Sequence, residues 1–514
     1  MGLETLLDVT AGVAPDRIAL GTREDGMSFA GLAARARGGA TLIRATGARH
    51  VVHLGVNGPA FACAVFAAAL SGVPITPLNY RLPDDQLLEL LAELQEPMVL
   101  ADPDMVDRVR SSGAEVIAAD EWLSRAAATP AAEPAEVTDD SVAVVLFTSG
   151  TTSRPKRVLL RHRNLLAYVL QTVDLLGAGE DECTLASVPP YHVAGVASVL
   201  SNVYAGRRVV HLPSFAPERW LDLVKAEGVT SAMLVPTMLT RIVDHLGDAA
   251  VDVPTLATIA YGGARVSPTA LERALRLFPG TGFVNAYGLT ETSSTIALLG
   301  PEDHRAAGTS DDPAVRARLG SAGRAVPGVE FRIRDEEGQP LGPGVLGELW
   351  VRGPQISGEY AGIGSLLDAD GWFPTRDRAM LDGEGYLFIE GRSDDTIIRG
   401  GENVAPAEVE DVLSRHPAVG DVGVVGVPDE EWGERIAAAV VLHPGAVVTA
   451  EELRAFAKGY LRSSRTPDEI VVWTELPYTE TGKLLRRRIA ARLAGEGGIG
   501  AAGPGPASAN VQGR

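Results

Sequence analysis

The stretch Leu146–Val158 reads LFTSGTTSRPKRV and joins a hydrophobic segment to a hydroxyl-rich turn that contains a lysine. The residues before the turn, Val142–Phe147, are all apolar, which is typical of a buried strand. Such a turn can hold an anion, because its backbone N–H groups can surround the anion and its glycine frees the backbone. The candidate groups belong to Thr148, Ser149, Gly150, Thr151, Thr152, Ser153 and Lys156. We therefore predict a phosphate site after a strand, and hence a nucleotide enzyme.

This turn is not a P-loop. The P-loop pattern G-x-x-x-x-G-K-[ST] needs a glycine directly before the lysine, whereas a proline precedes Lys156 and no second glycine follows Gly150 in the turn. A polar surface turn without a ligand is the alternative interpretation of the same residues.

Four later segments decide between these interpretations. They are NAYGLTE at Asn285–Glu291, FPTRDRAMLDGEGYLFIEGR at Phe373–Arg392, DDTIIRGGENVAPAEVE at Asp394–Glu410 and TETGKLLRRR at Thr479–Arg488. In order and spacing, the five segments resemble the motifs of adenylate-forming enzymes. This family contains acyl-CoA synthetases, free-standing adenylation domains and luciferases, and its phosphate loop usually reads TSGTTGxPKGV. The resemblance is strongest to free-standing acyl-CoA ligases.

Length and charge limit the classes of function. At 514 residues, the chain is several-fold longer than an average domain, so two or more cores are expected. A net charge of −20 argues against non-specific binding to nucleic acid or to an anionic membrane. A polyanionic substrate then requires a local basic site, which Arg154, Lys156, Arg157, Arg161 and Arg163 supply. For Arg161 and Arg163, we expect a solvated helix face instead.

The two cysteines, Cys63 and Cys183, offer neither a disulfide framework nor a metal cluster, which suits a reducing cytoplasm. The start of the chain lacks a basic region followed by a long apolar core, so no signal peptide is expected. The apolar stretch Pro59–Leu70 is too short to cross a bilayer, and we expect a buried helix there. The prediction is a cytoplasmic protein without a membrane span.

Helical and strand patterns alternate along the chain, which is typical of α/β folds. We expect helices after Ser28, from Gly58, and at 83–94 and 220–227, and strands at 51–56, 73–77, 98–101, 209–212, 232–235 and 259–261. A mobile connector is expected at 126–140, a loop at 300–312 and a smaller β unit at 328–352.

The resemblance implies an α/β fold with a large N-terminal domain, which includes the small β unit, and a small mobile α+β C-terminal domain. We place the large domain at 1–393, the hinge at Asp394, the small domain at 395–494 and a disordered tail at 495–514. The sequence has no carrier-protein segment with an acceptor serine, so we expect a free-standing enzyme, with a homodimer as one option.

The resemblance also implies roles for individual residues. ATP or acyl-AMP, Mg²⁺ and coenzyme A are the expected ligands, and Lys483 is expected to bridge the carboxylate and the α-phosphate. The β- and γ-phosphates would lie against Thr148, Ser149, Gly150, Thr151, Thr152 and Lys156. The rest of the nucleotide would contact Asn285, Ala286, Tyr287, Gly288, Asp377 and Arg392, with Thr290 beside Glu291 and with Glu291 holding Mg²⁺.

For the second step, the resemblance makes Asp394 the pivot and places CoA along Gly400, Gly401 and Glu402, although a simple turn explains the two glycines equally well. The acyl pocket would be lined by His192, Val193, Pro236, Thr237, Gly262, Gly263 and Ala264. Its small residues favour a bulky or long apolar acid.

The chain departs from the family pattern at three glycine positions, which are occupied by Ser153, Arg157 and Arg376. One interpretation is tolerated variation, with the two arginines adding phosphate contacts. The other is loss of adenylation, leaving an enzyme that converts acyl-AMP from a partner into the thioester; retention of Lys483 argues against it. Loading of a carrier protein is a third option. A non-catalytic binding protein is disfavoured, because the charged site residues persist.

Overall fold

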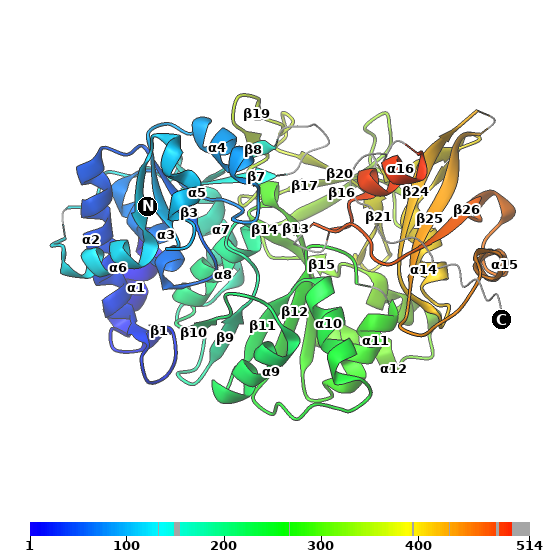
Figure 1. Ribbon diagram of the computed structural model, residues 1–514, viewed down its shortest axis with the longest axis horizontal. Helices are drawn as coiled ribbons and strands as arrows, with labels where there is room; N and C mark the ends of the chain where they lie inside the picture. The colour runs from blue at the N-terminus through cyan, green and yellow to red at the C-terminus, as the bar shows by residue number, and fades with distance from the viewer. Residues whose placement is uncertain are drawn as a thin grey trace, which may run out of the picture. The chain divides into compact units, whose positions relative to one another are not determined.

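The computed structural model describes residues 1–131, 133–148, 155–266, 268–392, 395–430, 432–479 and 483–495 (Figure 1). The chain divides into two compact units, one made of residues 1–393 and 480–483 and the other of residues 394–479 and 484–514. Both units mix helices and sheets, and the N-terminal unit is much the larger. The predicted fold class is therefore confirmed. The predicted hinge Asp394, and all of the predicted tail except Gly495, lie outside the described residues.

The larger unit contains a nine-stranded sheet whose central strands are parallel. Its order is β15 (Arg324–Ala325), β14 (Ser294–Leu299), β13 (Gly282–Leu289), β12 (Thr258–Gly262), β11 (Ser231–Leu234), β9 (Cys183–Ala186), β10 (Arg208–His211), β1 (Ile18–Leu20) and β2 (Met27–Ser28). From β9 the chain passes to β10 on one side and then to β11 on the other. The sheet thus has a topological switch between β9 and β11, where α/β sheets commonly form a ligand crevice.

A second sheet of the larger unit has eight strands. Its order is β19 (Gly364–Ser365), β18 (Glu359–Tyr360), β8 (Lys156–Arg161), β7 (Val142–Thr148), β4 (Ile75–Pro77), β3 (His50–Leu54), β5 (Pro97–Ala101) and β6 (Glu115–Ala118). Alternate residues of β3 face different cores: Val51 belongs to one apolar cluster and Val52 to another. Both faces of this sheet are therefore covered, which explains the apolar run that the sequence shows at β7.

A four-stranded antiparallel sheet completes the larger unit. It contains β16 (Glu330–Arg334), β17 (Gly347–Arg352), β20 (Phe373–Leu381) and β21 (Leu387–Arg392). The small β unit predicted at 328–352 corresponds to its first two strands.

Helices cover the two large sheets. Helices α2 and α3 pack against each other and α6 packs on α2, while α10 contacts α9, α11 and β12 (Figure 1). Their bounds are α1 (Glu4–Val13), α2 (Phe29–Thr46), α3 (Pro59–Ser71), α4 (Asp84–Ala92), α5 (Val106–Val109), α6 (Ala119–Ala128), α7 (His162–Thr172), α8 (Val193–Tyr204), α9 (Pro217–Ala226), α10 (Pro236–Leu246), α11 (Pro268–Leu277), α12 (Pro301–Thr309) and α13 (Pro313–Ala317). The predicted buried helix is α3, in which every residue from Phe61 to Ser71 is buried. In the described ranges, no helix has both the length and the hydropathy needed to cross a bilayer.

The smaller unit is built on one sheet, in which β25 pairs with β22, β24 and β26. Its elements are β22 (Ile397–Arg399), β23 (Glu402–Val404), α14 (Pro406–Leu413), β24 (Val419–Asp429), β25 (Gly433–Leu442), α15 (Ala450–Lys458), β26 (Glu469–Trp473) and α16 (Arg486–Leu493). Alternate residues of β25 enter two cores, with Ala438 in one and Ala437 in the other. The sheet is therefore covered on both faces.

Two expectations about local structure are wrong. The loop expected at 300–312 is largely helix α12, which has Pro301 at its first position and Glu302 and Asp303 in its first turn. Proline and acidic residues are favourable at this end of a helix. The buried side of α12 consists of His304 and Ala307, and this short apolar face explains why the pattern was missed. The connector expected at 126–140 begins as helix, because α6 continues to Ala128.

We expect Gly38→Ala to destabilise the protein by about 2 kcal/mol, the usual cost of overpacking. A Cβ atom at Gly38 in α2 would lie 2.0 Å from the carbonyl oxygen of Ala126 in α6. Gly12→Ala is the matched control, because Gly12 also lies in a helix but has open space around its Cβ position. Chemical denaturation should show lower stability for the first variant and equal or higher stability for the second. Equal behaviour of the two variants would contradict close packing of α2 on α6.

Candidate active site

Glu291 lies in a short 3-10 turn, Thr290–Thr292, between β13 and β14. Its carbonyl oxygen accepts hydrogen bonds from the backbone N–H groups of Ser357, at 2.9 Å, and Gly358, at 3.0 Å. The Thr292 hydroxyl and the Leu289 N–H are joined at 2.9 Å, and the side chain of Gln355 donates to the Thr292 carbonyl at 3.0 Å. The turn is therefore fixed from both sides, and the direction of the Glu291 side chain is fixed with it.

The Glu291 carboxylate accepts a hydrogen bond of 2.6 Å from the hydroxyl of Tyr360 in β18. Burial, and then the negative charge of Glu291, raise the pKa of this hydroxyl, so it stays protonated and donates. The Nζ atom of Lys156, at the start of β8, lies 5.6 Å from the centre of the Tyr360 ring. Strand pairing explains this approach, because Val158 of β8 is opposite Tyr360. Lys156 forms no ion pair within the described ranges.

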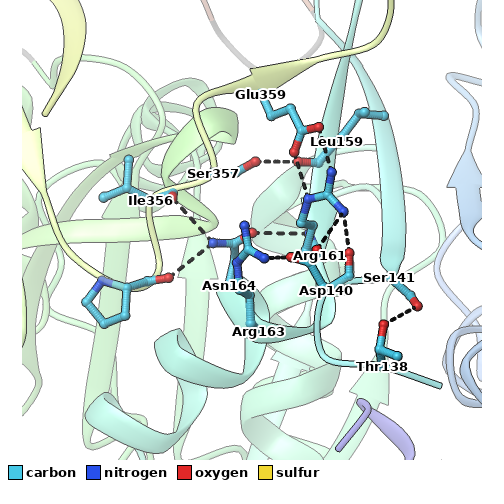
Figure 2. Close-up of polar contacts among 11 residues, drawn as sticks. Thr138, Asp140, Ser141, Leu159, Arg161, Arg163, Asn164, Ile356, Ser357 and Glu359 are labelled. Carbon is cyan, nitrogen blue, oxygen red and sulfur yellow. Dashed lines mark hydrogen bonds and ion pairs between the residues drawn. The ribbon is translucent and has the colours of Figure 1, made fainter. Parts of the chain in front are cut away.

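A network of polar contacts holds the segment that carries Tyr360 (Figure 2). Arg161 of β8 makes two hydrogen bonds, of 2.8 and 2.7 Å, to the Glu359 carboxylate. The side-chain amide of Asn164 donates to the carbonyl oxygens of Pro354, at 3.1 Å, and Ile356, at 3.3 Å. Ser357 donates its hydroxyl proton to the carbonyl of Leu159. The predicted solvated helix face at Arg161 is therefore wrong, since this side chain lies on a strand and joins β8 to Glu359 of β18.

A polar cavity of about 670 Å³ borders this network. Three arginines line it, and each is paired with an acid: Arg161 with Glu359, Arg163 with Asp140, and Arg352 with Glu330. Because its charges neutralise one another, the cavity offers no excess charge to an ionic ligand, and we assign it no catalytic role.

Asp377 lies in β20, and its side chain is 6% exposed. One carboxylate oxygen is 2.9 Å from Nε of Arg392 on β21, which is directly opposite, and the other accepts the hydroxyl proton of Tyr287 on β13. Burial raises the pKa of Asp377, although the charge of Arg392 and the hydrogen bond from Tyr287 oppose the rise. Three segments that are distant in sequence thus meet at one carboxylate.

The predicted acyl-pocket residues lie at the carboxyl ends of neighbouring strands. His192 and Val193 stand at the start of α8, Pro236 and Thr237 at the start of α10, and Gly262, Gly263 and Ala264 at or after the end of β12. These positions flank the switch between β9 and β11. Burial lowers the pKa of His192 to about 3, and its Nε2 atom is buried without a hydrogen-bond partner in the described part of the chain.

Gly262 is required by packing as well. A Cβ atom there would lie 2.1 Å from the carbonyl oxygen of Ala286, its partner on β13. The other predicted adenine-site residues, Asn285, Tyr287 and Gly288, also belong to β13, and the Asn285 amide donates to the Ser321 carbonyl at 3.0 Å. The predicted adenine segment is thus the strand beside the predicted acyl pocket.

The phosphate turn connects β7 to β8. Thr148 ends β7 and is paired with Lys156 at the start of β8, whereas Ser149, Gly150, Thr151, Thr152, Ser153 and Arg154 lie outside the described residues. A phosphate role for these residues stays a prediction.

Arg376 and Arg157, which both stand where the family pattern has glycine, differ from each other in backbone conformation and contacts. Arg376 has a φ of 61°, the left-handed conformation that costs a residue with a side chain about 1–2 kcal/mol. Arg157 lies within β8, opposite Phe147, and has no positive φ. Its guanidinium donates to the Glu93 carbonyl at 2.7 Å and lies 3.3 Å from the Glu93 carboxylate. Position 376 therefore favours glycine conformationally, whereas position 157 does not.

In the smaller unit, Gly400 and Gly401 form the turn between β22 and β23, with φ values of 58° and 82°. The Gly400 N–H donates to the Trp432 carbonyl at 2.8 Å, and Glu402 begins β23. The turn itself thus accounts for both glycines. Lys483, which groups with the larger unit, is exposed and directly precedes Leu484, which forms an isolated bridge with Tyr478. The CoA and catalytic roles of these residues stay predictions.

Sequence reasoning missed Tyr360 and Gln355. Neither belongs to the motifs quoted above, and their partners, Glu291 and Thr292, lie more than 60 positions away. Among the described residues, no group of three or more His, Cys, Asp or Glu side chains could enclose a metal. A single carboxylate such as Glu291 still suits Mg²⁺, which commonly binds one or two carboxylates together with substrate phosphates.

Comparison with known proteins identifies the family. Residues 7–361 match the model of the AMP-binding enzymes, and residues 408–483 match that of the AMP-binding enzyme C-terminal domain. The chain belongs to this family. Recognition from the sequence motifs is therefore confirmed.

Several relatives of this AMP-binding enzyme are acid–thiol ligases. An indoleacetate–CoA ligase from Aromatoleum aromaticum is 32% identical over 96% of this chain and 99% of its own length. The fatty acid–[acyl-carrier-protein] ligase ScoC from Streptomyces coeruleorubidus is 32% identical over 87% of each chain. The o-succinylbenzoate-CoA synthetase MenE from Bacillus subtilis, solved with its acyl-adenylate, has a TM-score of 0.80 at 30% identity and covers 94% of this chain and 97% of its own. The predicted enzyme class agrees with these relatives.

We expect Glu359→Gln to lower the free energy of unfolding by about 2 kcal/mol, because it breaks a charged, two-pronged contact. The side chains of Arg161 and Glu359 are only 22% and 20% exposed. Glu330→Gln is the matched control: its pair with Arg352 is more exposed, and such surface pairs contribute at most about 1 kcal/mol. Urea denaturation of both variants tests the difference. If Glu359→Gln lowers the free energy of unfolding no more than Glu330→Gln does, the ion pair between Arg161 and Glu359 has no special structural role.

We expect Asp377→Asn to stabilise the protein near neutral pH while it weakens nucleotide binding. The raised pKa means that folding disfavours the charged form, so the wild-type protein gains stability as the pH falls through that pKa. The advantage of the neutral asparagine should therefore shrink as the pH falls from about 7 towards the ordinary aspartate range. Thermal unfolding midpoints across this range provide the measurement. A variant that is less stable than wild type at neutral pH would show that Arg392 outweighs burial.

Proposed function

We propose that this enzyme is an acyl-CoA ligase, which joins a carboxylic acid to coenzyme A through an acyl-adenylate and converts ATP to AMP and pyrophosphate. The observation that carries the proposal is the fixed pair of sites in the larger unit. One is the Glu291 carboxylate, with Tyr360 and Lys156 beside it; the other is Asp377, with Tyr287 and Arg392. A carboxylate and a lysine that forms no ion pair with any described residue suit Mg²⁺ and phosphates, and a second carboxylate suits ribose hydroxyls.

In the proposed nucleotide site, Asp377 accepts hydrogen bonds from the ribose hydroxyls, and the charge of Arg392 opposes the rise in its pKa that burial causes. Tyr287 and its neighbours on β13 contact the adenine. Lys156, Thr148 and the hydroxyl turn hold the β- and γ-phosphates, and Glu291 holds Mg²⁺, which neutralises phosphate charge when bound. The Tyr360 hydroxyl keeps the Glu291 carboxylate in one orientation for this purpose.

In the first half-reaction, a carboxylate oxygen of the acid attacks the α-phosphorus of ATP. The bond from phosphorus to the bridging oxygen breaks, and its electron pair leaves with pyrophosphate. Positive groups and N–H donors lower the barrier by stabilising the charge that develops in the transition state. His192 contributes no charge, because its low pKa keeps the ring neutral, but its unpartnered Nε2 atom suits a hydrogen bond with the substrate. We assign the charge stabilisation at the carboxylate to Lys483.

For the acid, we propose an aromatic or other bulky apolar carboxylate. The predicted pocket lies at the switch of the nine-stranded sheet and is lined by residues without large side chains, namely Gly262, Gly263 and Ala264. A neutral buried histidine adds no charge that would favour a second carboxylate deep in the pocket. The acids named for two relatives, an indoleacetate–CoA ligase and a feruloyl-CoA synthase, are aromatic and carry a single carboxylate.

In the second half-reaction, the thiol of CoA attacks the acyl carbon, a carbon–sulfur bond forms, and AMP leaves with the electron pair of the carbon–oxygen bond. We assign the acceptor site to Gly400, Gly401 and Glu402 of the smaller unit, with Asp394 as the pivot between the two half-reactions. A carrier-protein thiol is the alternative acceptor, which the relative ScoC favours. The strained Arg376 favours a further alternative, an enzyme that uses acyl-AMP made by a partner.

Two parallel reactions test the proposal across a panel of acids: free acid with ATP, Mg²⁺ and CoA, and synthetic acyl-AMP with CoA. We expect thioester in both reactions. Product from acyl-AMP alone would replace the proposal with the partner-dependent enzyme. Product only when a carrier protein replaces CoA would identify a carrier-protein ligase. Absence of thioester and of acyl-AMP under every condition would refute ligase activity.

We expect Lys483→Ala to reduce adenylation by about 10²–10³-fold, the usual loss when one charge-stabilising group is removed, and to spare thioester formation from acyl-AMP. Pyrophosphate release measures the first step and thioester formation the second. Lys458→Ala, which removes an exposed lysine of α15, is the matched control and should leave both rates unchanged. Equal losses in both steps would assign Lys483 a different role.

A further inference from the structure

Arg376 occupies an irregular position in the four-stranded sheet. On β17 and β20, Trp350 pairs with Pro374 and Glu348 pairs with Arg378, so three residues of β20 lie opposite one residue of β17. Arg376 is the middle one of the three and adopts the left-handed φ of 61°. Bulges of this kind commonly place glycine at the left-handed position. An arginine there keeps a strain that a single substitution could remove.

Strained backbone conformations persist mainly where the strained residue has a function. The side chain of Arg376 performs no structural function that would explain the strain. It is exposed, and it forms no hydrogen bond or ion pair within the described ranges. Arg157, which stands at the other described departure, is by contrast tied to Glu93. The two arginines are therefore not equivalent: within the described part of the chain, Arg157 is paired and the Arg376 guanidinium is not.

The position of Arg376 is set by its neighbours. It directly precedes Asp377, the residue assigned to the ribose. Arg376, like Arg392, also lies near enough to Tyr360 for its positive charge to act on the hydroxyl. Tyr360 is the residue that contacts Glu291 and Lys156. Arg376 thus lies between the ribose side and the phosphate side of the site.

The charges at this place do not balance. Arg392 is paired with Asp377, whereas Lys156 and Arg376, which lie near Tyr360, form no ion pair within the described ranges. The charge of Lys483 reaches Asp377 as well. A site with excess positive charge attracts an anion, and binding of Mg²⁺ at Glu291 would increase the excess. Arginine also binds phosphate oxygens in a two-pronged geometry that a lysine cannot provide.

We propose that Arg376 is a further nucleotide-binding residue, which contacts the β- and γ-phosphates of ATP. This inference rests on the proposed function. When the bond between the α-phosphorus and the bridging oxygen breaks, the electron pair passes to pyrophosphate, and the Arg376 guanidinium stabilises that charge. Its contribution belongs to ATP and pyrophosphate and not to AMP, whose single phosphate is held elsewhere.

Two substitutions separate the charge from the strain. Arg376→Gly removes the charge and relieves the backbone, whereas Arg376→Gln removes the charge and keeps the strain. Calorimetric titration should give a Kd for ATP about tenfold higher in both variants, since a charged hydrogen bond is lost, and a Kd for AMP that changes less than about twofold. Only the glycine variant should unfold at a higher temperature than wild type, by about 2 °C or more.

Arg352→Gln is the matched control, because it removes one positive charge from the same sheet at a residue paired with Glu330. It should leave the Kd values for ATP and AMP unchanged. An equal change for ATP and AMP in the Arg376 variants would show an effect on Asp377 or the fold and would overturn the proposal, as would unchanged ATP binding in both. If the wild-type protein binds no ATP, the proposed adenylation activity is refuted, and the Arg376 inference with it. If wild type binds ATP and the variants match it, the Arg376 inference alone fails.

Discussion

The hydrogen bond between the Tyr360 hydroxyl and the Glu291 carboxylate is the contact on which the geometry of the site depends. Tyr360 belongs to the eight-stranded sheet and Glu291 follows β13 of the nine-stranded sheet. The N–H groups of Ser357 and Gly358 bind the Glu291 carbonyl, so side chain and backbone are held from the same segment. The two sheets therefore meet at one acidic residue, and any shift between them would move that residue.

The same junction explains the arrangement of charge. The half-buried Arg161 holds its segment in place through its carboxylate partner Glu359 (Figure 2). Lys156 and the strained Arg376 have no such partner among the described residues. In the proposed site, these cations give an overall acidic protein a local region that attracts phosphates.

Part of the fold and several candidate site residues could be predicted from the sequence, because they leave a local pattern in it. The strand β7 is an uninterrupted apolar run because both faces of its sheet are covered, and Glu291, Asp377 and Lys156 stand in recognisable motifs. Tyr360 and Gln355 could not be found, because their roles depend on pairing between segments far apart in the chain. Helix α12 was missed because only His304 and Ala307 mark its buried side. The placement of β9 next to β11 also depends on long-range pairing, which periodicity does not encode.

The switch between β9 and β11 has a consequence for how such an enzyme can diversify. The segments after β9, β11 and β12 are separate connections between strands. The hydrogen bonds of the nine-stranded sheet join the strands themselves and do not involve these connections. Residues on these connections can change without altering strand register or the junction at Glu291. Gly195 and Gly262 are exceptions, because a Cβ atom would lie 2.6 Å from the Pro189 carbonyl oxygen at the first and 2.1 Å from the Ala286 carbonyl oxygen at the second. In the proposed enzyme, recognition of the acid is thus free to change during evolution, while these glycines and the junction at Glu291 are not.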